Sequence, residues 1–277
     1  YAQSLSSDGN ILAIGNHEAN LTSQGLVGIY ENINGNWTQL GGYIDGVSPG
    51  NDFGISVSLS SDGSIVAIGA QHAYGNNSQT GHVRVFQWNG TSWSQIGQNI
   101  NGESNSDYSG QSVSISSDGN LVAIGAPKND GNGSNSGHVR IYEFNGTSWV
   151  QLGQDIDGEA SGDGSGSSVS FSSDGIRLAI GASQNDATSS GSTYDDNYGH
   201  VRIYEWNGLS WTQLGQDIDG ESDEQYLGYG NSSISFSNNG NILAVGSYRH
   251  DGSSGIQNDN RGHVKIYNYN GTSWTQL

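Results

Sequence analysis

The chain has 277 residues, enough for one large all-β domain or two ordinary domains; only 32% are hydrophobic, and 44 are glycine against two prolines. Its 27 acidic and 8 basic residues give a formal net charge of −19, which excludes nucleic acid as an expected partner because phosphates repel a negative surface. The absence of cysteine excludes disulfides and zinc–thiolate sites, and no apolar run has the roughly 20 residues of a membrane-spanning helix, so we expect no membrane insertion.

Two sequence blocks recur five times along the chain. The first is SVSLSSDGSIVAIGA at 56–70, with copies at 4–15, 112–126, 168–182 and 233–247. The second is GHVRVFQWNGTSWSQIGQNINGES at 81–104, with copies at 25–48, 137–160, 199–222 and 262–277. The equivalent turn residues Asp62 and Asp118 differ by 56 positions, so one repeat has about 56 residues.

Each repeat predicts four strands. In the second repeat, alternation over 56–60 indicates a strand with two different faces, and the apolar run 65–68 indicates a strand buried on both sides. A polar loop of variable length leads to a third strand over 82–88, and the fourth is expected over 91–96. No segment has a helical period. Five such units predict an all-β five-bladed β-propeller with four antiparallel strands per blade, with a linear β-solenoid as the alternative.

The whole chain is then expected to be one propeller domain. Its blades are expected at approximately 1–44, 52–100, 108–156, 164–218 and 228–277.

The dipeptide Asn89-Gly90 predicts a two-residue hairpin, because both residues tolerate a positive φ. That register places Phe86 opposite Trp93 and puts Arg84 within reach of the Trp93 ring. It predicts the aromatic pairs Phe86–Trp93, Tyr142–Trp149, Tyr204–Trp211 and Tyr267–Trp274. Packing between blades explains four such equivalent pairs better than sugar stacking does. The histidines at the start of this strand, His82, His138, His200 and His263, are interpreted as structural hydrogen-bonding residues.

The order of these motifs resembles the FG-GAP repeat of integrin α-subunit propellers and of many secreted proteins. The resemblance rests on Phe53-Gly54, on the strand that begins at His82, and on Gly125-Ala126-Pro127. It implies a propeller fold and a secreted or surface location. The calcium-binding loop typical of the family is not carried over, since the equivalent Ser-Asp-Gly turns hold one carboxylate or none.

A second acidic run offers a candidate metal site, and calcium is the only cofactor candidate. The run DIDGE holds Asp155, Asp157 and Glu159, and its copy holds Asp217, Asp219 and Glu221. Three carboxylates around a glycine bend could converge on one cation. The simpler alternative is a turn that buries its isoleucine, because the other copies have lost most of the charge.

Variation between repeats gathers in the loops after the second strand and in the loop before the fifth blade. Loops on a rigid scaffold carry function, and aromatics mixed with carboxylates suit carbohydrate or peptide contacts. The candidate ligand-binding residues are Tyr74, Asp130, Asp186, Tyr194, Asp195, Asp196, Tyr198, Tyr226, Tyr248, Arg249, His250 and Asp251.

No catalytic constellation is visible, so we expect a non-enzymatic binding or adhesion module, extracellular or at the cell surface, that recognises a glycan or a surface protein. One alternative is a glycoside hydrolase or polysaccharide lyase with carboxylates in the central well. The other is a structural repeat component of a cell-surface or virion assembly. Membership of a larger assembly or of a longer chain stays open.

Overall fold

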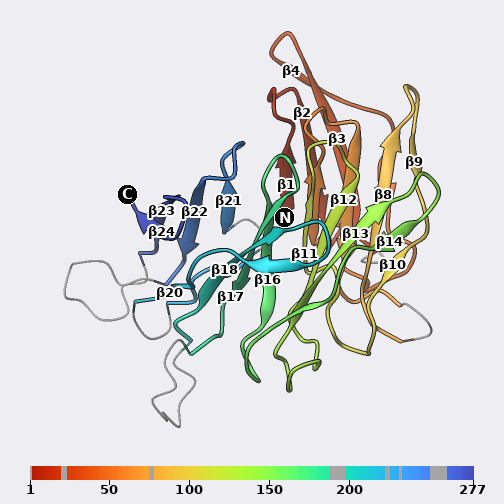
Figure 1. The fold of residues 1–277 in the computed structure, drawn as a ribbon. Coiled ribbons are helices and arrows are strands. Elements are labelled where there is room, and N and C mark those ends of the chain that lie inside the picture. The colour runs from red at the N-terminus through yellow and green to blue at the C-terminus, as the bar shows by residue number, and fades with distance from the viewer. Residues whose placement is uncertain are drawn as a thin grey trace. The chain divides into compact units, whose positions relative to one another are not determined.

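The computed structural model describes residues 2–19, 24–74, 78–186, 197–221, 225–230, 233–249 and 261–277. Every regular element in these ranges is a β-strand (Figure 1). They fall into two compact units, the first made of residues up to 126 with 140–152, and the second of 127–139 with 153–277.

The strands form five sheets, taken here in chain order. The first contains β1 (Ala2–Leu5), β2 (Ile11–Asn16), β3 (Leu26–Ile33), β4 (Asn36–Gln39) and β5 (Ile44–Asp45). The second contains β6 (Ser56–Leu59), β7 (Ile65–Ala70), β8 (His82–Trp88), β9 (Trp93–Gln95) and β10 (Ile100–Asn101). The third contains β11 (Ser112–Ile115), β12 (Leu121–Ala126), β13 (His138–Phe144), β14 (Trp149–Gln151) and β15 (Ile156–Asp157).

The last two sheets repeat this plan. The fourth contains β16 (Ser165–Phe171), β17 (Arg177–Ala182), β18 (His200–Trp206), β19 (Trp211–Gln213) and β20 (Ile218–Asp219). The fifth contains β21 (Ile234–Phe236), β22 (Ile242–Ser247), β23 (His263–Tyr269) and β24 (Trp274–Gln276). The five four-stranded antiparallel units expected from the repeats are therefore present.

The outer edge of a sheet is shared by two short strands. In the fourth sheet, β19 pairs with the end of β18, while β20 pairs with its beginning through His200↔Asp219 and Val201↔Ile218. The DIDGE run and its copy thus continue the sheet beyond the fourth strand. Ile156 and Ile218, the central residues of the two runs, are each only 4% exposed, as the turn interpretation expects.

The register predicted at the Asn-Gly hairpin is wrong by two residues. Trp88 pairs with Trp93, and Phe86 pairs with Gln95 instead of Trp93. The cause is the Asn89 side chain, whose Oδ1 accepts the backbone N–H of Thr91 at 3.0 Å and of Ser92 at 2.9 Å. These bonds favour a four-residue connection over the two-residue turn.

The observed aromatic pairs therefore differ from the predicted ones, Phe86–Trp93, Tyr142–Trp149, Tyr204–Trp211 and Tyr267–Trp274. They are Trp88–Trp93, Phe144–Trp149, Trp206–Trp211 and Tyr269–Trp274, with ring centroids 5.1–5.5 Å apart. The Arg84 guanidinium lies 4.7 Å from the centre of the Phe86 ring, so its expected contact with Trp93 is also replaced. A change of two residues keeps every side chain on its predicted face.

The tryptophans serve packing between sheets, as the repeated pattern indicates. Trp93 Nε1 donates to the carbonyl of Leu40, and Trp274 Nε1 donates to the carbonyl of Leu214, each at 3.0 Å. In both cases the acceptor belongs to the preceding sheet. Trp274 is only 3% exposed, which leaves no face open for a sugar ring.

Serines of the first strands form a second link between sheets. Ser4 Oγ accepts the backbone N–H of Leu59 at 2.9 Å, and Ser58 Oγ accepts that of Ile115 at 3.1 Å. Around these bonds, Val85 and Ile115 belong to one buried apolar cluster. The alternation of serine with apolar residues in the first strand thus has a structural use on both faces.

Glycines at the Phe-Gly and Gly-Ala positions allow a close approach of backbones. Gly54 has φ +89° and donates its N–H to the carbonyl of Gly69 at 2.9 Å. A Cβ on Gly69 would lie 2.0 Å from the carbonyl oxygen of Gly110. A side chain at Gly69 therefore cannot be placed without moving that backbone.

Candidate functional site

The structure describes seven of the twelve candidate loop residues. Asp130 and Asp186 are exposed and hold their own loops, because they accept the backbone N–H of Asn135 at 2.8 Å and of Asn197 at 2.9 Å. Tyr74 is 60% exposed, and Tyr198 is half-buried. The candidates Tyr194, Asp195, Asp196, His250 and Asp251 lie outside the described residues.

The other three candidates, Tyr226, Tyr248 and Arg249, come together in the second unit. The ring of Tyr226 lies 5.8 Å from that of Tyr248, and both contact the ring of Tyr229, at 6.2 and 5.1 Å. The Arg249 guanidinium lies over Tyr226 and Tyr248, at 5.3 and 5.2 Å from the ring centres. These four residues are the tyrosine–arginine cluster.

Tyr229 is missing from the candidates predicted from the sequence. It stands in the enlarged segment before the fifth blade, three residues after Tyr226, so the spacing of the two tyrosines was the available signal. The segment is anchored to the sheet, since Gly228 donates its N–H to the carbonyl of Gly246 at 3.0 Å, and Ser247 Oγ donates to the carbonyl of Gln225 at 2.7 Å.

A pocket opens beside the cluster. Its volume is about 480 Å³, and Tyr229, Tyr248, Arg261, His263 and Val264 are among the residues that line it. Tyr229 is 50% exposed and Tyr248 46% exposed. The cluster therefore offers aromatic faces and guanidinium donors to a molecule in solution.

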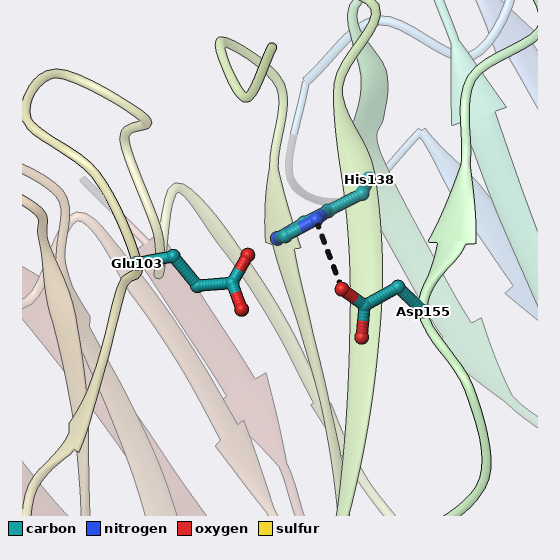
Figure 2. Close-up of side chains that lie close together, drawn as sticks. All are labelled: Glu103, His138 and Asp155. Atoms are coloured by element: carbon teal, nitrogen blue, oxygen red, sulfur yellow. Dashed lines mark ion pairs between the residues drawn. The ribbon is translucent and has the colours of Figure 1, made fainter. Parts of the chain in front are cut away.

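The carboxylates of the acidic run DIDGE face two different histidines. Figure 2 shows Asp155 turned toward His138, with Asp155 Oδ2 3.8 Å from His138 Nδ1. Asp157 Oδ1 lies 4.0 Å from the same nitrogen. Glu159 instead faces the fourth sheet, where its Oε2 lies 3.9 Å from His200 Nδ1 and its Oε1 lies 3.4 Å from Arg202. Two carboxylates of the run thus face His138, and the third faces His200 and Arg202.

The carboxylates of the copy of this run also face different partners. One ligand atom each of Glu159, His200 and Asp217 lie within 4.8 Å of one another; these residues form the His200 cluster. Burial and the negative charges of Asp217 and Glu159 raise the pKa of Asp219. Glu221 pairs with Lys265 of the fifth sheet.

Burial lowers the pKa of His200 to about 4, and the nearby Arg202 acts in the same direction. The imidazole is therefore neutral near pH 7, the form in which histidine binds metal. The contact between these histidines and the acidic runs is absent from the sequence interpretation. The sequence does contain a signal for this contact. In the repeat of His82, Val47 and Asn99 stand where the repeat of His200 has its two acids, so both acids are missing there together.

The described part of the chain holds no helix able to cross a membrane. Comparison with curated proteins gave no match. Comparison with family models matched residues 101–142 to the FG-GAP repeat.

Solved structures share the fold at low sequence identity. A structure described as a putative 6-phosphogluconolactonase from Bacteroides uniformis has a TM-score of 0.63 at 13% identity, covering 100% of this chain and 69% of that chain. The periplasmic gluconolactonase of Pseudomonas aeruginosa has a TM-score of 0.62 at 16% identity, covering 100% and 70%. TolB from Acinetobacter baumannii has a TM-score of 0.54 at 16% identity, covering 97% of this chain and about half, 51%, of TolB.

These relatives are propeller-like, and identities this low establish the fold alone. Together with the five four-stranded sheets they confirm the predicted fold class, an all-β five-bladed β-propeller. The matched segment begins in the second of the two sequence blocks and runs through the first block and the third strand of the following blade, and these motifs recur along the chain. Within this β-propeller fold, residues 101–142 match the FG-GAP repeat.

Proposed function

We propose that this protein is a carbohydrate-binding module that acts outside the cytoplasm, and that the tyrosine–arginine cluster is its binding surface. The observation that carries the proposal is the mutual packing of three tyrosine rings beside a pocket of about 480 Å³. Arg249 covers two of these rings, those of Tyr226 and Tyr248. A sugar ring has apolar C–H faces and a rim of hydroxyls, so it needs aromatic faces together with hydrogen-bond donors.

Local charge supports a ligand that carries hydroxyls or carboxylates. The chain has 8 basic residues against 27 acidic ones, and Arg249 and Arg261 both lie at the cluster or its pocket. Guanidinium groups donate several hydrogen bonds in one plane and stay charged at any physiological pH. Neutral and uronic-acid-containing glycans are therefore the ligand class to test. The periplasmic location of the gluconolactonase relative agrees with a role outside the cytoplasm.

A glycan array, followed by calorimetric titration of the best ligand, tests the proposal. Tyr229→Ala and Tyr248→Ala should each weaken binding about tenfold or more, because aromatic anchors dominate binding energy. Tyr74→Ala removes an exposed tyrosine that is not part of the cluster and should bind as the wild type does. Unchanged melting temperatures would establish that the variants are folded.

Two outcomes would contradict the proposal. One is that the wild-type protein retains no glycan on the array. The other is that both tyrosine variants bind the best glycan as tightly as the wild type does. Release of new reducing ends from a bound polysaccharide would identify the enzymatic alternative instead.

A further inference from the structure

We propose that Glu159, His200 and Asp217 form a binding site for a divalent transition-metal ion of the zinc type. The three residues come from separate segments: Glu159 follows β15, His200 begins β18 and Asp217 immediately precedes β20. One ligand atom of each lies within 4.8 Å of the other two. All three belong to the second compact unit.

The distances between the ligand atoms of the His200 cluster suit atoms that share one bound ion better than atoms that bond directly to each other. His200 Nδ1 and Glu159 Oε2 are 3.9 Å apart, too far for a hydrogen bond. Two ligands on one tetrahedral zinc ion lie about 3.4 Å apart, given bonds of about 2.0–2.2 Å. Small rotations of the two carboxylates, which are partly exposed, would bring the three donors to that separation.

The imidazole of His200 is buried, with one ring nitrogen toward the two carboxylates. His200 is only 2% exposed, yet its Nε2 has no hydrogen-bond partner in the described structure, and its Nδ1 faces the two carboxylates. Coordination through Nδ1 would use the neutral tautomer that carries its proton on Nε2.

The charge around the cluster suits a divalent cation. Asp217 and Glu159 act electrostatically on Asp219, and the basic residue Arg202 contacts Glu159. Arg202 binds Glu159 Oε1 at 3.4 Å and leaves Oε2 on the side of His200. Three negative charges and one positive charge leave a surplus of about two, which one divalent ion would neutralise.

The donor set favours zinc over calcium. Calcium takes six to eight oxygen ligands, whereas imidazole nitrogen suits zinc and other late transition metals. Water would complete the coordination, as at open zinc sites. Calcium, the candidate suggested by the acidic runs, is therefore the comparison ion.

The chain provides its own control histidine. His82 begins β8, is also 2% exposed and has an unpartnered Nδ1, but Val47 and Asn99 replace the two acids. Glu103, His138 and Asp155 occupy the equivalent positions of the third repeat (Figure 2). Titrations should therefore be made in the His138→Ala background, so that the signal reports the His200 cluster.

Calorimetric titration with Zn²⁺ is the test. His138→Ala protein should bind one Zn²⁺ per chain, and adding Glu159→Gln or Asp217→Asn should weaken that affinity at least tenfold. Adding Glu143→Gln, which removes an exposed acid elsewhere, or His82→Ala should leave the affinity unchanged. Zn²⁺ should also raise the melting temperature of the His138→Ala protein and not that of its Asp217→Asn derivative.

The two carboxylate variants keep the histidine in place, so a folding defect at His200 does not enter the comparison. The proposal would be overturned if both carboxylate variants bound Zn²⁺ as tightly as the His138→Ala parent does. It would also be overturned if the folded His138→Ala protein bound no Zn²⁺. Tighter binding of Ca²⁺ than of Zn²⁺ would overturn the assignment of the ion class.

Discussion

Trp149 of the third sheet donates its indole N–H to the backbone carbonyl of Ile96 in the second sheet, at 3.1 Å. Trp149 is 3% exposed, so its indole is buried at this contact. The same bond joins Trp93 to Leu40 and Trp274 to Leu214. One polar atom of the tryptophan therefore contributes to each of these contacts between sheets, in addition to the area of its ring.

Trp149→Phe should separate these two contributions. Phenylalanine keeps a buried ring but leaves the Ile96 carbonyl without its donor, so the free energy of unfolding should fall by about 1–3 kcal/mol. Trp37→Phe is the matched control, since Trp37 occupies the same repeat position in the first sheet but is 46% exposed. Denaturant unfolding of both variants measures the difference. A loss in Trp149→Phe no larger than that in Trp37→Phe would contradict a contribution from the buried indole hydrogen bond.

The Ser-Asp-Gly turns should make the protein sensitive to acid below pH 4. The hydrogen bond from Ser6, with those from Asn10, lowers the pKa of Asp8 to about 2. Burial acts to raise the pKa of Asp118, but hydrogen bonds from Ser116 and Asn120 lower it overall. A lowered carboxyl pKa stabilises the folded state above the unfolded pKa of about 3.9, and this stability is lost as the pH falls through the folded pKa.

Asp118→Asn should therefore flatten the fall of melting temperature between pH 4 and pH 2. At neutral pH the change should cost about 0.5 kcal/mol or less. The fifth repeat already carries Asn239 there, and its Oδ1 accepts from Ser237 Oγ at 2.8 Å and from the Asn241 N–H at 3.1 Å. A melting curve that keeps the wild-type slope in acid would contradict this account of the turn.

His82 should affect stability in a higher pH range. Burial lowers its pKa to about 4, with Arg84 acting in the same direction. Between the unfolded pKa of about 6.5 and the folded value, only the unfolded chain takes up the proton, so stability falls as the pH falls. A lowering of the His82 pKa from 6.5 to about 4 corresponds to a loss of stability on the order of 3 kcal/mol across that pH range. His82→Gln should remove that part of the loss between pH 6.5 and pH 4, measured by unfolding at each pH. The slope below pH 4 should remain.

Arg177 should act as a specific link between the fourth and fifth sheets. Its Nε donates to Glu205 Oε2 at 2.9 Å, and its Nη1 donates to the Gly240 carbonyl at 2.9 Å. The guanidinium also lies 5.1 Å from the centre of the Tyr269 ring. Arg177→Met should lower the free energy of unfolding by about 1–3 kcal/mol.

Arg177→Lys should restore less than half of this loss, because an ammonium cannot make the two directed bonds and stack on the ring together. Lys128→Met removes a positive charge without such contacts and is the control. Full restoration by lysine would show that charge alone is responsible.

Much of the fold follows from the sequence because each strand and turn pattern recurs five times along the chain. Alternation around Val57 and the apolar run around Ile68 place strands that the structure contains. The hairpin register fails because the dipeptide Asn89-Gly90 does not reveal that the Asn89 side chain will bind the Thr91 and Ser92 N–H groups. A local side-chain bond thus outweighs the φ preference from which the turn was predicted.

The candidate sites depend on contacts that sequence spacing does not contain. Tyr226 and Tyr248 come together only because β21 and β22 bring two loops to one end of the sheet. Glu159 reaches His200 because β15 ends beside the start of the following sheet. Three carboxylates close in sequence could share one cation, with a turn as the simpler alternative. The pleat keeps Asp155 and Asp157 beside His138, and the bend after Gly158 directs Glu159 to His200.

The serine contacts between first strands have a consequence for how such a chain can grow. Ser4 and Ser58 accept N–H groups of the peptide backbone, and Trp93 and Trp274 donate to backbone carbonyls. These groups are present whatever side chain stands at the partner position, so neighbouring blades need no matched substitutions to bind each other by these bonds. A tandem duplication within the gene would yield a new blade whose contacts are already compatible on both sides, while its loops remain free to diverge.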